Sequence, residues 1–334
     1  MTEDISNYTF DFEKEARQLR RSLPSKGKNV LIAETDVTQP DGPGTPVQVD
    51  VRHMIGNQKT KDIHAIDFQE WIEMTYRKEP NSSSTVVAPP GENLYGLSIR
   101  KEEKFIYLLG EENKEMMRLF MLYHETGHVM LPDGPVVDND HPFKECSADA
   151  YAALRILQRF GREAEPFLSM VSWQRTLNAI IGDPSHLTTA VFDRIIADSA
   201  MQDFTQLTPA QITKLAKKYA EDGTPEDAIF TEAKDLFVHG PKINFPRLAE
   251  TCLSSSNQFA FYIGAKFFQP FLEPQGVILN GRQMALTDGN RQEYAGLIEA
   301  GSISAAFSDK AARPLAALLK VSRPRGQKQF VVSI

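Results

Sequence analysis

The motif His124-Glu125-Thr126-Gly127-His128 places two histidines four positions apart, with a glutamate directly after the first. Residues four apart lie on the same face of an α-helix, one turn above the other. Two imidazole nitrogens in that arrangement can bind one zinc ion, each at about 2.1 Å. A glutamate beside them can take a proton from a water that the zinc activates. The motif therefore predicts two metal ligands, His124 and His128, and a catalytic general base, Glu125.

The residues around the motif predict a buried helix over 112–130. This stretch has no proline, and apolar residues recur along it at spacings of three and four and also cover its other sides. A helix that is apolar nearly all round is buried. Buried polar groups without partners cost about 1–3 kcal/mol each, and a metal would satisfy the two histidines. The alternative is a pair of core histidines that hydrogen-bond to backbone or carboxylate groups.

A catalytic zinc usually has three protein ligands and one open position. A second helix is expected from about residue 141 to Phe160, with Gly161 as its C-terminal cap. On this helix Glu145 and Asp149 lie four apart, on one face and among alanines. We expect Glu145 to be the third zinc ligand. We expect Asp149 to accept a hydrogen bond from the free ring N–H of a ligand histidine.

Other assignments of these residues stay open. Asp138, Asp140 and His141 are rival third ligands at shorter spacing from the motif. Glu145 and Asp149 could instead be solvated charges near a helix N-terminus, where the helix dipole favours them. Cys146 is expected to be a small core residue, because it projects about 100° away from Glu145 on the helix.

The motif followed by Glu145-Cys146-Ser147-Ala148-Asp149-Ala150-Tyr151-Ala152 resembles a gluzincin-type zinc metallopeptidase. The flanking segments 118–123 and 129–132 are similar to those of the ImmA/IrrE-like group. The resemblance covers about residues 104–161, which is under a fifth of the chain. It implies that a strand before the motif helix is an edge strand that pairs with extended substrate. That strand would be 104–109, and Tyr107 and Leu108 would then bind substrate.

The expected function is hydrolysis of peptide bonds in a restricted protein substrate, with Zn2+ as cofactor and Glu125 as general base for the attacking water. The donor that stabilises the oxyanion is not assigned; the candidates are Tyr123, Tyr151, His141, His186 and His239. One alternative is a regulatory or binding protein of zincin fold, ImmA/IrrE-like, with little or no general proteolytic activity. Another is a structural zinc site, which would need four ligands, often cysteines.

The composition is that of a globular protein that does not span a membrane. Hydrophobic residues make up 41% and charged residues 24% of the 334 positions. The net charge of -7 argues against general nucleic-acid binding, although the basic segment 310–328 keeps a nucleic-acid or acidic partner open. The absence of a signal-peptide core and of a long apolar run predicts a cytoplasmic protein, with non-classical secretion not excluded. The oligomeric state is not predicted.

The predicted fold class is α+β, with a small twisted sheet packed on the motif helix and a mostly helical C-terminal region. The expected domains are an N-terminal helix and linker over 1–47, a zincin-like core over 48–165 and a mainly helical domain over 166–334. Within the last, Asn280-Gly281 predicts a β-hairpin near 278–286. Thr208-Pro209 and Thr224-Pro225 are expected to begin helices.

Overall fold

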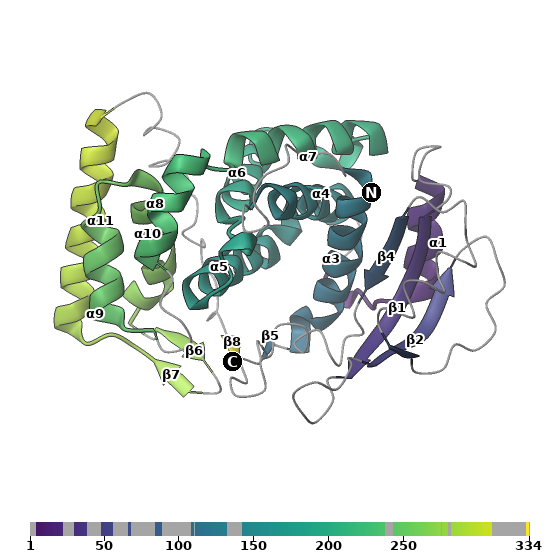
Figure 1. Cartoon of the computed structure of the whole chain (residues 1–334), viewed down its shortest axis with the longest axis horizontal. Coiled ribbons are helices and arrows are strands. Elements are labelled where there is room, and N and C mark those ends of the chain that lie inside the picture. The colour runs from purple at the N-terminus through teal and green to yellow at the C-terminus, as the bar shows by residue number, and fades with distance from the viewer. Residues whose placement is uncertain are drawn as a thin grey trace.

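A computed structural model describes most of the chain. The described residues are 5–22, 30–38, 48–55, 66–67, 84–88, 108–109, 111–131, 142–237, 243–274, 276–279, 282–308 and 332–333. Helices form the bulk of these residues, and most of them lie in the middle and at one end of the molecule, while α1 and strands β1, β2 and β4 lie at the other end (Figure 1).

Ten α-helices are found among the described residues. They are α1 (Phe12–Ser22), α3 (Glu111–Met130), α4 (Phe143–Phe160), α5 (Glu165–Ile181), α6 (Thr189–Ser199), α7 (Pro209–Gly223), α8 (Asp227–Phe237), α9 (Phe245–Leu248), α10 (Gln258–Phe268) and α11 (Asp288–Ser308). Short 3-10 or π turns join several of them: η1 (Ile5–Asn7), η3 (Gly161–Ala164), η4 (Pro184–His186), η5 (Phe204–Gln206), η6 (Ala249–Leu253) and η7 (Gln269–Leu272).

The described strands form one four-stranded and two two-stranded sheets. The strands are β1 (Val30–Thr38), β2 (Gln48–Ile55), β3 (Ile66–Asp67), β4 (Ser84–Ala88), β5 (Leu108–Leu109), β6 (Val277–Leu279), β7 (Arg282–Met284) and β8 (Val332–Ser333). The larger sheet has the order β3-β2-β1-β4, with β1 antiparallel to β2 and parallel to β4. The small sheets pair β5 with β8 and β6 with β7, both antiparallel.

The predicted fold class, α+β with a small twisted sheet packed on the motif helix, is wrong. The described part of the chain is mostly helical, and α3 packs on other helices as well as against β4. Phe120 of α3, for example, contacts Phe167 of α5 and Phe192 of α6. The prediction rested on short strand-like segments between residues 48 and 110, and the tendency of a segment to form a strand depends strongly on context. The domain limits at 47/48 and 165/166 stay a prediction.

Several helix boundaries predicted from the sequence are confirmed. The motif helix expected over 112–130 is α3. The second helix is α4, and Gly161 caps it with a positive φ of 63°, a backbone conformation that glycine adopts without strain. Thr208 caps α7 through a reciprocal capping box with Gln211.

Helix α3 and helix α4 touch backbone to backbone at Gly127. A Cβ atom at this position would lie 2.7 Å from Cα of Ala148 and 2.9 Å from its carbonyl oxygen. Real Cβ atoms do not approach that closely, so only glycine allows the two helices this separation. The contact lies inside the motif itself, and it sets the distance between the histidines of α3 and the carboxylates of α4.

Two buried hydrophobic clusters meet at α5. Phe167, Leu168 and Val171, from the first half of α5, join the cluster that contains α3, α4, α6 and α7. Trp173 and Leu177, further along, join the cluster built from α8 to α11. A single helix therefore contributes to both cores, which holds the two helical groups together.

A buried polar network reinforces this junction. Asp193 of α6 accepts hydrogen bonds from Lys266 at 2.7 Å, from Ser172 at 2.8 Å and from Tyr262 at 2.7 Å. All four side chains are buried. A buried charge is costly unless it is paired and hydrogen-bonded, and here each carboxylate oxygen of Asp193 has a donor. The network links α5, α6 and α10.

Among the helices that the structure describes, none combines the length and the apolar character needed to cross a membrane.

Replacing Gly127 with alanine is expected to force α3 and α4 apart. Overpacking of this kind typically costs about 1–3 kcal/mol, and the shift would also separate the motif histidines from Glu145. Urea unfolding and zinc titration measure both effects. Gly296→Ala on α11 is the matched control, since a Cβ there meets nothing within 4 Å and alanine favours a helix by up to about 1 kcal/mol. Equal stability of the two variants would contradict the close approach.

Candidate metal centre

Three helices and one turn bring their polar side chains together at the motif. Helix α3 contributes His124 and His128, α4 contributes Glu145 and Asp149, α5 contributes Arg175, and η4 contributes His186. The convergence follows from the helix periodicity within α3 and α4 and from their contact at Gly127.

The donor atoms of the three predicted ligands lie as close together as the ligands of a single metal ion. Nε2 of His124 is 3.2 Å from Nε2 of His128 and 3.2 Å from Oε2 of Glu145, and Nε2 of His128 is 3.5 Å from Oε1 of Glu145. A tetrahedral ion with bonds of about 2.1 Å holds its ligands about 3.4 Å apart. Among the described residues these three side chains form the one group that could hold a metal ion in this way.

The donor atoms also fit a metal chemically. Oε2 of Glu145 is buried and finds no hydrogen-bond partner within the described part of the chain. It lies beside two imidazole nitrogens, those of His124 and His186, at 3.2 and 3.3 Å. An unsatisfied buried acceptor is costly, and a cation bound between the imidazoles and this carboxylate would satisfy it. Two histidines and one glutamate are a donor set that zinc takes in hydrolytic enzymes.

Asp149 binds Nδ1 of His124, the ring nitrogen that does not face the other two ligands. Nδ1–H of His124 donates to Oδ1 of Asp149 at 2.6 Å, the contact expected from the sequence. The same oxygen accepts from Arg175 at 2.8 Å, and Oδ2 accepts from Thr188 at 2.6 Å. Because Nδ1 carries the proton toward Asp149, the lone pair of Nε2 in the neutral ring faces His128 and Glu145. This orientation is the one that a metal ligand requires.

The electrostatics of the cluster favour charged carboxylates. Burial opposes ionisation of Asp149, but Arg175 and His124 outweigh it and hold the pKa of Asp149 below its usual range. Burial likewise opposes the anion of Glu145, yet the neighbouring imidazoles of His124 and His128 lower its pKa below the usual range. For His124, burial disfavours the cation, but Asp149 and Glu145 prevail and raise its pKa to about 10. Without a metal, a proton on His124 therefore occupies the place between the carboxylates.

His186 lies at the edge of this group. Its Nε2 is 3.3 Å from Oε2 of Glu145, and its Nδ1 is 2.7 Å from Oδ2 of Asp183. Ser185 donates to the other oxygen of Asp183 at 2.6 Å. Burial favours the neutral acid at Asp183, but the hydrogen bond with His186 lowers its pKa. The turn η4 thus fixes the ring of His186 toward the cluster.

Glu125, the predicted general base, is half-buried on α3 between the two histidines in sequence. No hydrogen bond or ion pair of its carboxylate is recorded within the described part of the chain. Its neighbours His124 and Thr126 point into the core and are buried. A carboxylate without a protein partner beside the ligand face is available to a water molecule.

Other residues singled out from the sequence fall elsewhere. Tyr123 and Tyr151 are buried in the core cluster of α3 and α4, and Cys146 is a buried thiol whose pKa burial raises to about 12. Leu108 lies in β5. Five predicted candidates lie outside the described residues: Tyr107, Asp138, Asp140, His141 and His239.

Sequence reasoning missed Arg175, Thr188 and Asp183. Arg175 had a usable signal, because it is the one charged residue in the apolar stretch between Pro166 and Ile181. Such a residue needs a buried partner. Thr188 and Asp183 carried no signal of their own, since polar residues around a short turn are ordinary.

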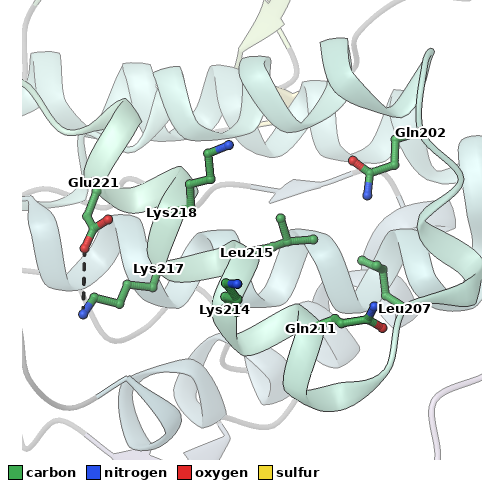
Figure 2. Close-up of a pocket in the computed structure, with 8 residues that line it drawn as sticks. All are labelled: Gln202, Leu207, Gln211, Lys214, Leu215, Lys217, Lys218 and Glu221. Carbon is green, nitrogen blue, oxygen red and sulfur yellow. Dashed lines mark ion pairs between the residues drawn. The ribbon is translucent and has the colours of Figure 1, made fainter.

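A groove of about 630 Å³ lies away from this cluster, on α7. Figure 2 shows Lys214, Lys217 and Lys218 along it, with Lys217 paired to Glu221 at 3.8 Å. None of its lining residues belongs to the histidine cluster. Solvated lysines on an exposed helix face account for it.

Comparison with protein-family models, with curated proteins and with solved structures finds no match to this chain. The similarity of 104–161 to gluzincins and to the ImmA/IrrE-like group therefore stays a prediction.

Zinc binding should depend on the carboxylates of α4 in a graded way. Glu145→Ala removes a ligand and is expected to abolish stoichiometric zinc. Asp149→Asn keeps all three ligands but weakens the support of His124, for an expected loss of about 10–100-fold in affinity. Titration against a chromogenic chelator measures both, with circular dichroism to check the fold. The exposed Glu232→Gln on α8 is the control and should bind as wild type. Wild-type affinity in Asp149→Asn would contradict the assignment.

The metal-free protein should lose stability as the pH rises. Because the pKa of His124 is raised to about 10 in the folded state from about 6.5 in the unfolded chain, its stabilising contribution is complete below about pH 6.5. It is lost progressively from there to about pH 10. Urea unfolding with a chelator present, at pH 6.5 and 9.5, should show a larger loss for wild type than for His124→Gln. Equal losses would exclude a stabilising proton on His124.

Proposed function

We propose that this chain is a zinc-dependent metallopeptidase. The observation that carries the proposal is the meeting of His124, His128 and Glu145 around the unsatisfied, buried Oε2 of Glu145. The cluster contains two imidazoles and one carboxylate, which leaves a fourth position for water or substrate. A closed structural site would need a fourth protein ligand. Among the described residues, no fourth His, Cys, Asp or Glu places a donor atom within 4.8 Å of all three ligand atoms.

Each residue of the cluster has a separate role in the proposed reaction. Zinc, when bound by His124, His128 and Glu145, supplies Lewis acidity toward the scissile carbonyl and toward a water molecule. Glu125 accepts the proton of the attacking water and delivers it to the leaving amine. Asp149 keeps His124 in the tautomer that binds metal, and Arg175 with Thr188 keeps Asp149 in place.

His186 is our candidate for the group that stabilises negative charge developing on the carbonyl oxygen. It is the one of the five donors considered from the sequence that lies within 3.3 Å of the ligand cluster in the described part of the chain. Asp183 pairs with Nδ1 of the ring at 2.7 Å, so in the imidazolium form Nε2–H is held toward Glu145 as a donor before substrate arrives. Preorganised donors of this kind are a large source of rate enhancement.

The substrate expected for this site is an extended segment of a restricted protein, and the expected place of action is the cytoplasm. Both rest on the sequence. The alternative, a zincin-fold regulator with little or no proteolysis, keeps the same metal cluster and differs in having no turnover.

Exchanging Glu125 for glutamine tests the peptidase assignment. The isosteric amide cannot accept the proton of water, so hydrolysis is expected to fall by about 10²–10⁴-fold, while zinc content stays near one ion per chain. Elemental analysis gives the zinc content, and a library of quenched fluorogenic peptides gives turnover.

Two results would overturn the assignment in different ways. No zinc in the wild type, even after reconstitution, removes the metal centre. Zinc without turnover on any library peptide or on unfolded protein favours the regulatory alternative. His186→Gln, with zinc retained and kcat lowered more than KM is changed, would support the role of His186.

A further inference from the structure

Ser172, Thr176 and Thr189 form a seam of buried hydroxyl groups between α5 and α6, the hydroxyl seam. The hydroxyls of Thr176 and Thr189 lie 2.8 Å apart, and the hydroxyl of Thr176 lies 3.1 Å from the carbonyl oxygen of Ser172. The hydroxyl of Ser172 lies 3.4 Å from the carbonyl oxygen of Thr189. All three side chains are buried. Because a buried hydroxyl without a hydrogen bond is costly, these contacts fix the position of α5 along α6.

One end of the hydroxyl seam reaches the metal centre. Thr188 precedes Thr189 in the chain and donates to Oδ2 of Asp149 at 2.6 Å. On α5, Arg175 precedes Thr176 and donates to Oδ1 of Asp149 at 2.8 Å. The two donors that hold this carboxylate are therefore the chain neighbours of two seam residues. A shift of α5 along α6 would separate them, and the carboxylate that orients a ligand histidine would lose one of its donors.

The other end of the hydroxyl seam meets a buried ion pair. Ser172 donates to Oδ1 of Asp193 at 2.8 Å, and Lys266 of α10 donates to the same oxygen at 2.7 Å. Tyr262, one turn earlier on α10, donates to Oδ2 at 2.7 Å. A carboxylate as deeply buried as that of Asp193 is strongly unfavourable without its cation. Asp193 lies five residues beyond Thr188, which is about 7.5 Å along α6.

We propose that Lys266 is a positioning residue for the metal centre and acts on it through Asp193, the hydroxyl seam and Asp149. Its ammonium neutralises Asp193, and this keeps α6 in the register on α5 at which Thr188 and Arg175 both reach their carboxylate. The proposal rests on the proposed function for the identity of the metal. It adds a role for the helical group of α8 to α11, which sets the zinc affinity of a centre whose ligands lie on α3 and α4.

The zinc affinity of the folded protein distinguishes this role from simple stabilisation. Lys266→Met removes the ammonium, keeps a long unbranched side chain and leaves Asp193 without its cation. Changes along a contiguous network typically alter the coupling between two sites by about 2- to 30-fold, and we expect zinc to bind more weakly by a factor in this range. Titration against a chromogenic chelator measures the affinity, and circular dichroism checks the fold.

Ile263→Ala is the matched control. Ile263 lies on the same helix and is buried in the cluster of α8 to α11, so its truncation destabilises the same helical group. It makes none of the hydrogen bonds to Asp193, and zinc should bind as in wild type. If Lys266→Met does not fold, Tyr262→Phe replaces it, because it removes only one donor to Asp193. Wild-type affinity in the folded variant, or an equal loss in Ile263→Ala, overturns the proposal.

A double-mutant cycle tests the route. Thr188→Val removes the hydroxyl that donates to Asp149 and keeps the shape of the side chain, so it too should weaken zinc binding. Because Lys266 acts through this contact, Lys266→Met should weaken zinc binding much less in the Thr188→Val background than in the wild type. Independent sites would give the product of the two single losses, and that result overturns the proposed route.

Hydrogen exchange in the presence of a chelator gives a readout that needs no zinc. The amides of Val191 and Phe192 bond to the carbonyl oxygen of Thr188 at the start of α6. Lys266→Met should speed exchange of the peptide that carries them more than Ile263→Ala does, and equal exchange overturns the coupling. A wild-type chain that binds no zinc but shows this difference keeps the coupling and loses the metallopeptidase. Zinc binding without the difference does the reverse.

Discussion

The backbone contact between Gly127 of α3 and Ala148 of α4 is the constraint on which the candidate site depends. Glycine removes the side chain that would keep the two helices apart, and alanine presents only a methyl group in return. At that separation Glu145 reaches both motif histidines, and Asp149 reaches the far side of His124. A wider gap would separate Glu145 and Asp149 from the imidazoles of α3.

Around this contact, side chains of opposite charge from α3, α4 and α5 lie next to one another. The imidazoles of α3 face the carboxylates of α4, and Asp149 in turn binds Arg175 of α5 and the hydroxyl of Thr188. Each carboxylate oxygen of Asp149 has a cationic or hydroxyl donor, which keeps this buried acid ionised. The same logic recurs at Asp193, where Lys266, Tyr262 and Ser172 satisfy a buried charge between the two helical groups.

Segments from both ends of the chain contact the elements around the site. Near the N-terminus, Glu15 of α1 forms a buried ion pair with Arg159 of α4 at 2.6 Å, which fixes α1 against the helix that carries Glu145. At the other end, β8 lies on the strand that leads into α3. The first contact supports the ligand helices.

The sequence by itself determined the local part of this site. A four-residue spacing places His124 with His128 and Glu145 with Asp149, because helix periodicity acts within one element; the limits of α3 and α4 followed from proline, glycine and apolar periodicity for the same reason. The α+β class was wrong because strand content depends on tertiary context. Only the tertiary structure decided that Arg175, Thr188 and His186 join the cluster and that β8 covers β5, since contacts between distant segments depend on how the helices pack and carry no periodic signal in the chain.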